Sequence, residues 1–310
     1  MVLNVSLNDA LFIGKTQIMH FKIIFSLLIV VFSVPEAYNQ DNSNEKHKYF
    51  LTDFCILAGE ITQVKNTTSV EKYQKFLPQA SLLKTDFSDF SSGGGGTDRN
   101  SSAILSVLAS FKKVNAQHKS LRFGASIFEN TYVAAYASRY VNQPLDTVTY
   151  TQTGEKFYRS RSSFRNYGMQ TESINFRLDA AYIYNFFPDD RILFYSGICL
   201  GSNFSLNAHT NIYYSFEDYT RMESENGSVL FGPESYGWTD MPERINHKGN
   251  FGVNIYVPLG LDFQLTEKGD FHKTHLIYEF RPGFNGQFGG LGHYSGKQWE
   301  HKFGLKFALK

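Results

Sequence analysis

The amino-acid sequence predicts an all-β protein: an eight-stranded, antiparallel, up-and-down β-barrel that crosses a membrane, with short periplasmic turns and long outer loops. Three observations lead to this prediction. Apolar and polar residues alternate along most of the chain, which is the period of a β-strand. Aromatic residues make up 16% of the 310 residues although the mean hydropathy is only −0.30, as expected when one face of each strand is apolar. The connections between these strands alternate in length, as they do in outer-membrane barrels.

The segment before the predicted barrel is typical of a secretory signal peptide. Residues 21–34 (FKIIFSLLIVVFSV) form a long apolar run of 14 residues, whereas a helix needs about 20 to span a bilayer. A short basic start precedes this run and a polar stretch follows it, so we expect a signal peptide over 19–39. A buried helix or an uncleaved anchor is the alternative. Residues 1–18 resemble no signal-peptide start, and we expect translation to begin at Met19, with the barrel domain over 40–310.

The strands follow from the alternation. Along 174–186 large apolar residues occupy every second position, and Asn175, Arg177 and Asp179 lie between them. In the third strand the apolar parity switches between Ile127 and Tyr132, which predicts a β-bulge or emergence of the strand from the apolar layer. The eight predicted strands span residues 49–64, 103–114, 120–142, 172–187, 191–216, 250–265, 272–284 and 297–309.

The connections divide into two kinds. Residues 115–119, 188–190 and 266–271 are expected to be short turns at one end. Longer connections are expected at the other end, over 65–102, 143–171, 217–249 and 285–296. The first of these contains a short helical pattern over 70–77, which Pro78 should end.

Two folds share such alternating strands, and three features favour a barrel in lipid over a secreted soluble β-sandwich or barrel. The apolar faces are long, with up to eight positions in 251–265. The opposite faces are small or polar and several carry charge, which suits a filled lumen. Aromatic residues gather near strand ends, for example Phe186, Tyr213 and Trp299, where the aromatic girdles of membrane barrels lie. The soluble binding protein stays as the alternative.

Four segments resemble the small outer-membrane β-barrel proteins of the Bacteroidetes and, more loosely, OmpA- and OmpW-type eight-stranded barrels. These segments are 176–208, 257–265, 276–284 and the terminal FGLKFALK at 303–310. The resemblance implies a location in the bacterial outer membrane, contact with its lipid and lipopolysaccharide, and insertion by the barrel-assembly machinery. One departure is that the chain ends in Lys310, whereas many outer-membrane proteins end in an aromatic residue.

The lumen is the first candidate site. An eight-stranded barrel is just wide enough to be filled by side chains, and charges there must pair because an unpaired buried charge is costly. We therefore expect a structural ion-pair network, with a narrow path for ions or small solutes as the alternative. By parity, the side chains that face inward are Arg122, Arg177, Asp179, Asp262, Glu279, Arg281, Lys302 and Lys306.

Catalysis has little support in the sequence, and we expect no enzyme activity, no cofactor and no metal. No G-x-S-x-G or H-E-x-x-H motif occurs. His272 and His275 should point to opposite faces of a strand, and the glycine run at 91–96 lacks the Lys-Ser/Thr of a phosphate loop. Cys55 and Cys199 are expected as isolated thiols, with a disulfide as the alternative. A lipid-modifying barrel enzyme is the second functional hypothesis.

Charge gives the last indications about partners. With 30 Lys and Arg against 29 Asp and Glu, the chain offers no reason to expect nucleic acid. The predicted outer loops differ in sign, since 143–171 is net positive and 217–249 is net negative. These loops either pair with each other or provide a contact surface for lipopolysaccharide, host or partner proteins. The sequence thus predicts a structural, surface-interaction or narrow-pore protein.

Overall fold

The computed structural model describes most of the chain that follows the predicted signal peptide. The segments 1–18 and 19–39, the turn 188–190 and His272 lie outside the described residues. Most of the described residues are in β-strands, which confirms the all-β prediction. None of the helices within the described part is long and apolar enough to cross a membrane. The described residues are 49–93, 99–114, 116, 118–152, 154–187, 191–225, 227, 229–231, 235–238, 242–266 and 273–309.

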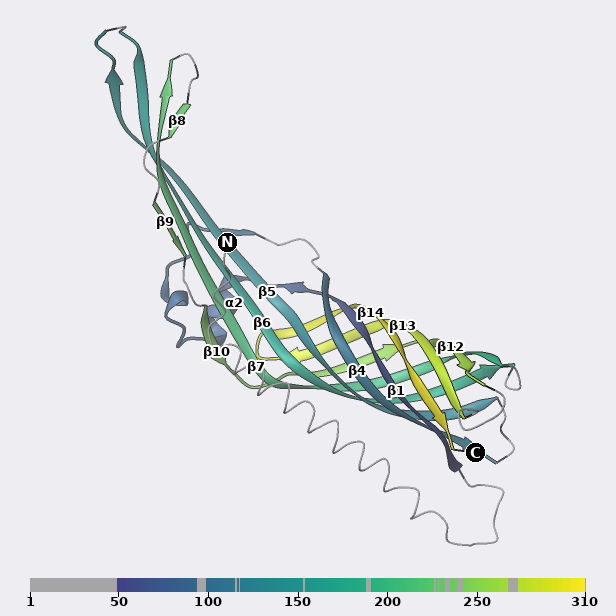
Figure 1. Ribbon diagram of the computed structural model, residues 1–310. Coiled ribbons are helices and arrows are strands. Elements are labelled where there is room, and N and C mark those ends of the chain that lie inside the picture. Colours follow the sequence, from purple (N-terminus) through teal and green to yellow (C-terminus); the bar gives the residue numbers. More distant parts are fainter. Residues whose placement is uncertain are drawn as a thin grey trace, which may run out of the picture.

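Antiparallel pairing joins the long strands into a closed ring (Figure 1). Each predicted strand has a counterpart in it, except that the one over 250–265 is divided in two at Val257 and Pro258. The ring closes because the last strand pairs with the first. In order, its strands are β1 (Tyr49–Val64), β4 (Arg99–Lys113), β5 (Lys119–Thr149), β6 (Lys156–Phe186), β7 (Ile192–Ser224), β11 (Phe251–Tyr256) with β12 (Leu259–Gln264), β13 (Thr274–Gly289) and β14 (Gly292–Ala308).

The outer face of the ring is apolar and exposed. Leu200 and Phe284 are each 58% exposed and Phe303 is 63% exposed. They belong to alternating runs in which every second residue has a large apolar side chain that points outward. Strand β11 shows this alternation as a strict exposed–buried pattern. The inner face instead buries arginine, lysine, glutamate and amide side chains. The ring is therefore apolar outside, and its interior combines these polar groups with a buried apolar cluster that includes Leu57, Leu108 and Ile183.

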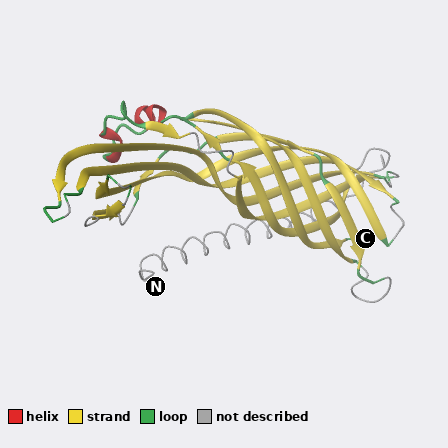
Figure 2. Cartoon of the chain, turned by 90° about the horizontal axis from the view of Figure 1, so that it is seen from above, coloured by secondary structure: helices red, strands yellow, loops and turns green. Residues whose placement is uncertain are grey.

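Three strands continue past the ring as an arm, formed by residues 133–171 of β5 and β6 and by 208–224 of β7 (Figures 1 and 2). The predicted bulge is confirmed, because the register of β5 on β6 shifts between Thr131 and Val133. A matching shift on β6 and β7 lies between Glu172 and Ile174. The inward and outward faces exchange at these shifts, and the arm begins there.

Two segments that were predicted to be loops are wholly or partly strands of the arm. Residues 143–171 are a hairpin of β5 and β6 with a turn near Tyr150 and Gly154, and 217–249 begins as the end of β7. Both segments look like loops in sequence because the two faces of the arm strands are largely polar, so no apolar alternation marks them. Short strands then pair along β7: β8 (Val229–Phe231), β9 (Ser235–Trp238) and β10 (Glu243–Asn246).

The predicted long connection at 285–296 is also wrong. β13 runs to Gly289 and β14 starts at Gly292, with a tight turn between them. Gly292 has φ +116°, in the region that favours glycine. The glycines of this segment suggested a loop, but most of them lie within paired strands.

Residues 65–93 form a cap on the arm. They contain β2 (Asn66–Thr67), the helix α2 (Val70–Phe76), the 3₁₀ turn η3 (Leu82–Lys84) and β3 (Ser91–Gly93). The helix confirms the predicted pattern, since the Ser69 side chain caps its start and it ends before Pro78. β3 pairs with the edge of β5.

The cap has its own hydrophobic core and bridges one end of the ring. Tyr73 is fully buried, and its hydroxyl lies 3.1 Å from the Val133 carbonyl and 2.8 Å from the Thr171 hydroxyl of the arm. Across the ring, an added Cβ on Gly290 in the β13–β14 turn would lie 2.1 Å from the ring of Phe76. The cap core comprises Val70, Tyr73, Leu77, Ala80, Leu83, Phe87, Val133, Ala135, Ala137, Tyr167, Met169, Ile212 and Leu291.

Glu243 of β10 ties the cap to β7. Its carboxylate accepts hydrogen bonds from the backbone N–H groups of Ser81 (2.7 Å) and Leu82 (2.9 Å). Burial alone would raise the pKa of this carboxyl, but these donors outweigh it and the pKa lies below its usual value. A depressed pKa means that the stabilisation is complete above the unfolded-state pKa and is lost as the pH falls through the folded-state pKa.

We expect the cap to loosen in acid through Glu243. The hydrogen-exchange protection factors of the Ser81 and Leu82 amides should be constant from pH 7 to about pH 5 and fall below about pH 4. In Glu243→Gln they should be low and independent of pH. Protection factors that do not change between pH 7 and pH 3 in the unaltered protein would contradict the assignment.

Candidate functional site

A cluster of buried charges crosses the middle of the ring. Arg177 of β6 makes a two-pronged pair with Glu300 of β14, in which Nη1 bonds Oε1 and Nη2 lies 2.9 Å from Oε2. The Nε of Arg177 also lies 3.1 Å from a carboxylate oxygen of Asp179. Both Arg177 and Glu300 are fully buried. Such planar, charge-assisted pairs fix the relative position of opposite walls of the ring.

Arg281 of β13 forms the second centre of the cluster. It bonds the Glu279 carboxylate through Nε and lies 3.4 Å from Asp179 through Nη1. Its Nη1 also donates to the Tyr256 hydroxyl at 2.9 Å. Arg281 thereby joins the carboxylates of two strands that do not neighbour each other.

Arg122 and Lys302 complete the cluster. Arg122 of β5 lies 2.6 Å from Glu279, which also accepts a hydrogen bond of 2.5 Å from the Tyr195 hydroxyl. Lys302 of β14 lies 2.7 Å from Glu300, and its Nζ donates to the Ser106 hydroxyl at 2.9 Å. We name this group the central ion cluster; it comprises Arg122, Arg177, Asp179, Glu279, Arg281, Glu300 and Lys302.

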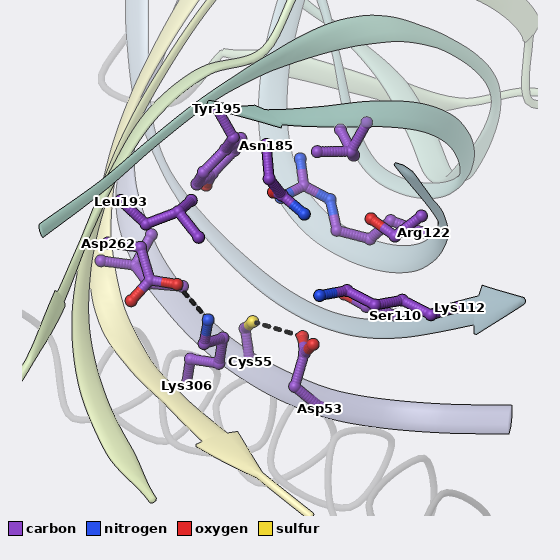
Figure 3. A pocket seen from close by; sticks show the side chains of 13 residues that line it. Asp53, Cys55, Ser110, Lys112, Arg122, Asn185, Leu193, Tyr195, Asp262 and Lys306 are labelled. Carbon is purple, nitrogen blue, oxygen red and sulfur yellow. Dashed lines mark hydrogen bonds and ion pairs between the residues drawn. The ribbon is translucent and has the colours of Figure 1, made fainter. Parts of the chain in front are cut away.

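A separate, smaller charge group lies toward the end of the ring away from the cap. Asp262 pairs with Lys306 and lies 2.7 Å from Nδ1 of His275. It borders a pocket that Figure 3 shows, in which Lys306 faces Asp262 and Cys55 faces Asp53. The residues that line the pocket are Asp53, Cys55, Ser110, Lys112, Ser120, Arg122, Ile183, Asn185, Leu193, Tyr195, Asp262, Ile277 and Lys306.

The structure brings most of the predicted inward charges together. Arg122, Arg177, Asp179, Glu279, Arg281 and Lys302 belong to the central ion cluster, whereas Asp262 and Lys306 form the separate pair. The sequence reasoning missed Glu300, Tyr195 and Tyr256. The signal for Glu300 was present, because it has the same strand parity as Lys302. The two tyrosines were overlooked because aromatic residues were assigned to the outer face.

The chemistry available to this site is electrostatic. Every carboxylate of the central ion cluster is in direct contact with a guanidinium or ammonium group. Cys55 and Cys199 are buried free thiols, so the alternative of a disulfide is wrong. Within the described residues no group of three or more His, Cys, Asp or Glu is placed to hold a metal ion.

Gly260 leaves the space that Tyr195 fills. A Cβ at this position would lie 2.0 Å from Cζ of the tyrosine ring. We expect Gly260→Ala to displace Tyr195 from Glu279 and to lower the free energy of unfolding by about 1–3 kcal/mol, measured by denaturant titration in detergent. Gly286→Ala is the matched control, because there an added Cβ meets nothing closer than 3.9 Å. Equal effects of the two substitutions would count against a packed lumen.

Comparison with known proteins gives structural likeness only. The sequence matches no protein family and no curated protein. The fold is similar to Neisserial surface protein A, with 11% identity over 83% of this chain and 97% of that chain and a TM-score of 0.30. It is similar to Ail of Yersinia pestis (8%, 83% and 100%, TM-score 0.26) and to the outer membrane protein OprG of Pseudomonas aeruginosa (11%, 86% and 99%, TM-score 0.24). Likenesses this distant carry no argument about the activity of this chain.

Proposed function

We propose that this protein is an outer-membrane β-barrel of the small Bacteroidetes type, which crosses the bilayer with the up-and-down strands of the ring and has no catalytic role. The observation that carries the proposal is the outer face of the ring, where side chains such as Leu200, Phe284 and Phe303 are more than half exposed. Soluble proteins rarely expose contiguous apolar patches of more than a few hundred Å². A membrane barrel requires such a belt, so lipid is the partner of this face.

The arm and cap are the parts that would project into the medium. Opposite charges of the arm pair within it, since Arg165 holds Asp218 by two bonds of 2.8 and 2.9 Å and Arg159 lies 3.0 Å from Asp146. The Arg165 hydrogen bonds lower the pKa of Asp218 below its usual value. The Arg165–Asp218 pair supports pairing between segments 143–171 and 217–249, whereas the Arg159–Asp146 pair lies within the first segment.

The arm also offers a contact surface. Tyr140, Tyr150 and Tyr158 are each at least half exposed on it, and tyrosine is common where proteins bind partners. The role we propose is therefore envelope structure or surface interaction, with lipopolysaccharide, host or partner proteins as candidates. Insertion by the barrel-assembly machinery belongs to the same proposal. The proposal includes no nucleic-acid partner.

A narrow pore is the second candidate function, and the site disfavours it. The central ion cluster fills the cross-section of the ring with paired buried charges, and the cap bridges one end. Planar-bilayer recordings should therefore show no channels. Reproducible openings would favour the pore. A lipid-modifying enzyme would instead be recognised by lipid hydrolysis with purified protein.

The decisive experiment is membrane fractionation combined with heat-modifiability. The protein should be in the outer-membrane fraction, and unheated samples should migrate differently from boiled ones on a denaturing gel, because closed barrels resist detergent at low temperature. A periplasmic protein with no heat-dependent shift would overturn the membrane proposal and favour a soluble β-barrel or sandwich.

A further inference from the structure

A chain of hydrogen bonds runs from the segment after β10, through the arm, into the cap. Four side chains form it between two backbone carbonyl groups, and three of these side chains, on Tyr73, Thr171 and Thr210, are fully buried. We name it the hydroxyl chain. Its members, in order, are the carbonyl of Lys248, the side chains of His247, Thr210, Thr171 and Tyr73, and the carbonyl of Val133.

Each contact in the hydroxyl chain is short enough for a hydrogen bond. Nδ1 of His247 lies 2.9 Å from the Lys248 carbonyl, and Nε2 lies 3.2 Å from the Thr210 hydroxyl. The Thr171 hydroxyl lies 2.9 Å from that of Thr210 and 2.8 Å from that of Tyr73. The last contact, of 3.1 Å, joins the Tyr73 hydroxyl to a carbonyl of β5. The hydroxyl chain thus links all three strands of the arm to helix α2.

With a neutral histidine the hydroxyl chain is one proton short. Both of its ends are carbonyl oxygens, which only accept, so all five contacts need a proton from the four side chains. Each hydroxyl supplies one proton and a neutral imidazole supplies one, so either tautomer of His247 leaves one contact without a proton. An imidazolium supplies two protons, and all five contacts are then made.

We propose that His247 is a pH-dependent switch in the contact between the cap and the arm, because protonation of its imidazole completes the hydroxyl chain. In the cation every hydroxyl donates in the same direction, away from His247 and toward Val133. The added bond is complete below the pKa of His247 and is lost as the pH rises through it, because only the cation supplies the fifth proton. This switch does not rest on the proposed membrane location.

The surroundings of His247 set the pH at which the switch operates. The imidazole is partly buried under the ring of Phe76, with 4.9 Å between ring centroids. Burial and the neighbouring His209 lower the pKa of His247 below its ordinary value, although the Lys248 carbonyl opposes this. The switch should therefore operate in a mildly acidic medium, below about pH 6.5.

The other charged groups near His247 have contacts of their own. Nε2 of His209 lies 3.3 Å from Glu172, and Arg244 lies 3.3 Å from Nδ1 of His209. Glu243 accepts from the cap backbone. The titratable or charged side chains that surround His247 are Tyr73 on α2, Glu172 on β6, His209 on β7, Glu243 and Arg244 on β10, and Lys248 next to it.

Two substitutions that shorten the hydroxyl chain test the proposal. Tyr73→Phe and Thr210→Val each remove one proton and two contacts, which leaves three contacts and three protons with a neutral histidine. The neutral form is then complete, so each substitution should lower the pKa of His247 by about 0.5–1 pH unit. The measurement is an NMR titration of the histidine-labelled full-length protein in detergent, with the His247 signal assigned by His247→Gln.

Tyr73→Phe is the sharper of the two tests, because its hydroxyl is three contacts away from the imidazole. Tyr167→Phe is the matched control. Tyr167 is buried in the same cap core, but its hydroxyl lies 3.2 Å from Thr85 and outside the hydroxyl chain. This variant should leave the pKa of His247 unchanged.

The sign of the change decides the outcome. If Thr210 merely donates to a neutral histidine, Thr210→Val removes a bond of the neutral form and raises the pKa of His247. An unchanged or raised pKa in either variant, with an amide spectrum that shows it to be folded, would overturn the proposal. A fall that Tyr167→Phe reproduces would overturn it as well.

Discussion

Glu300→Gln should lower the free energy of unfolding by about 3–5 kcal/mol, because it removes the carboxylate that Lys302 contacts and leaves Arg177 with Asp179 alone. Glu300 is the two-pronged partner of Arg177 and lies 2.7 Å from Lys302. Both cations are fully buried, so water cannot replace the lost charge. The measurement is reversible urea unfolding of the protein in lipid vesicles, followed by the heat-dependent gel shift.

The control for Glu300 is a carboxylate with a cation partner at the surface. Glu223 lies 3.1 Å from Arg221 on the arm, and both side chains are more than a third exposed. Exposed pairs contribute about 0–1 kcal/mol, so Glu223→Gln should change stability little. If the two substitutions have equal effects, the central ion cluster is not the buried, fully paired network described above.

The second large effect is expected at Leu200, an exposed residue at which a substitution would have little effect in a soluble protein. Leu200 is 58% exposed and lies in the middle of the outward run 194–206 of β7. In water, Leu200→Arg would be harmless. In a bilayer, an arginine at the midplane of a barrel costs about 2–4 kcal/mol. We therefore expect a loss of that size in urea unfolding from vesicles.

Leu145→Arg provides the comparison for Leu200. Leu145 is 45% exposed but belongs to the arm, where the proposal places water instead of lipid. Surface substitutions of this kind usually change stability by no more than about 0.5 kcal/mol. Equally small losses at both positions would contradict a lipid-facing belt.

The ring could be predicted from sequence because each of its strands separates two environments. Along 174–186 one face must be apolar and the other must fit a crowded polar interior, so the period of two is visible without any structure. The same rule located the inward charges and the bulge near Thr131. Parity does not say which charges meet, so the partition between the central ion cluster and the Asp262–Lys306 pair needed the three-dimensional arrangement.

The arm and the cap could not be predicted from the sequence, for physical reasons. The arm strands are largely polar on both faces, so alternation is lost beyond residue 143. The helix α2 could be recognised, but its docking could not, because Tyr73 and Leu77 find their partners on β5, β6 and the β13–β14 turn. Strand parity places Asn175 on the inner face, but it does not show which side chains Asn175 contacts.

The pairing of the first strand with the last has a consequence for biogenesis. Glu300 and Lys302 lie on β14, which must dock on β1 to close the ring. Until then Arg177 has no two-pronged partner, and both edges of the sheet expose unpaired backbone groups. Docking of β14 therefore places Glu300 against Arg177 in the closed ring. A chain whose last strand has not docked therefore has open sheet edges and lacks the Arg177–Glu300 pair.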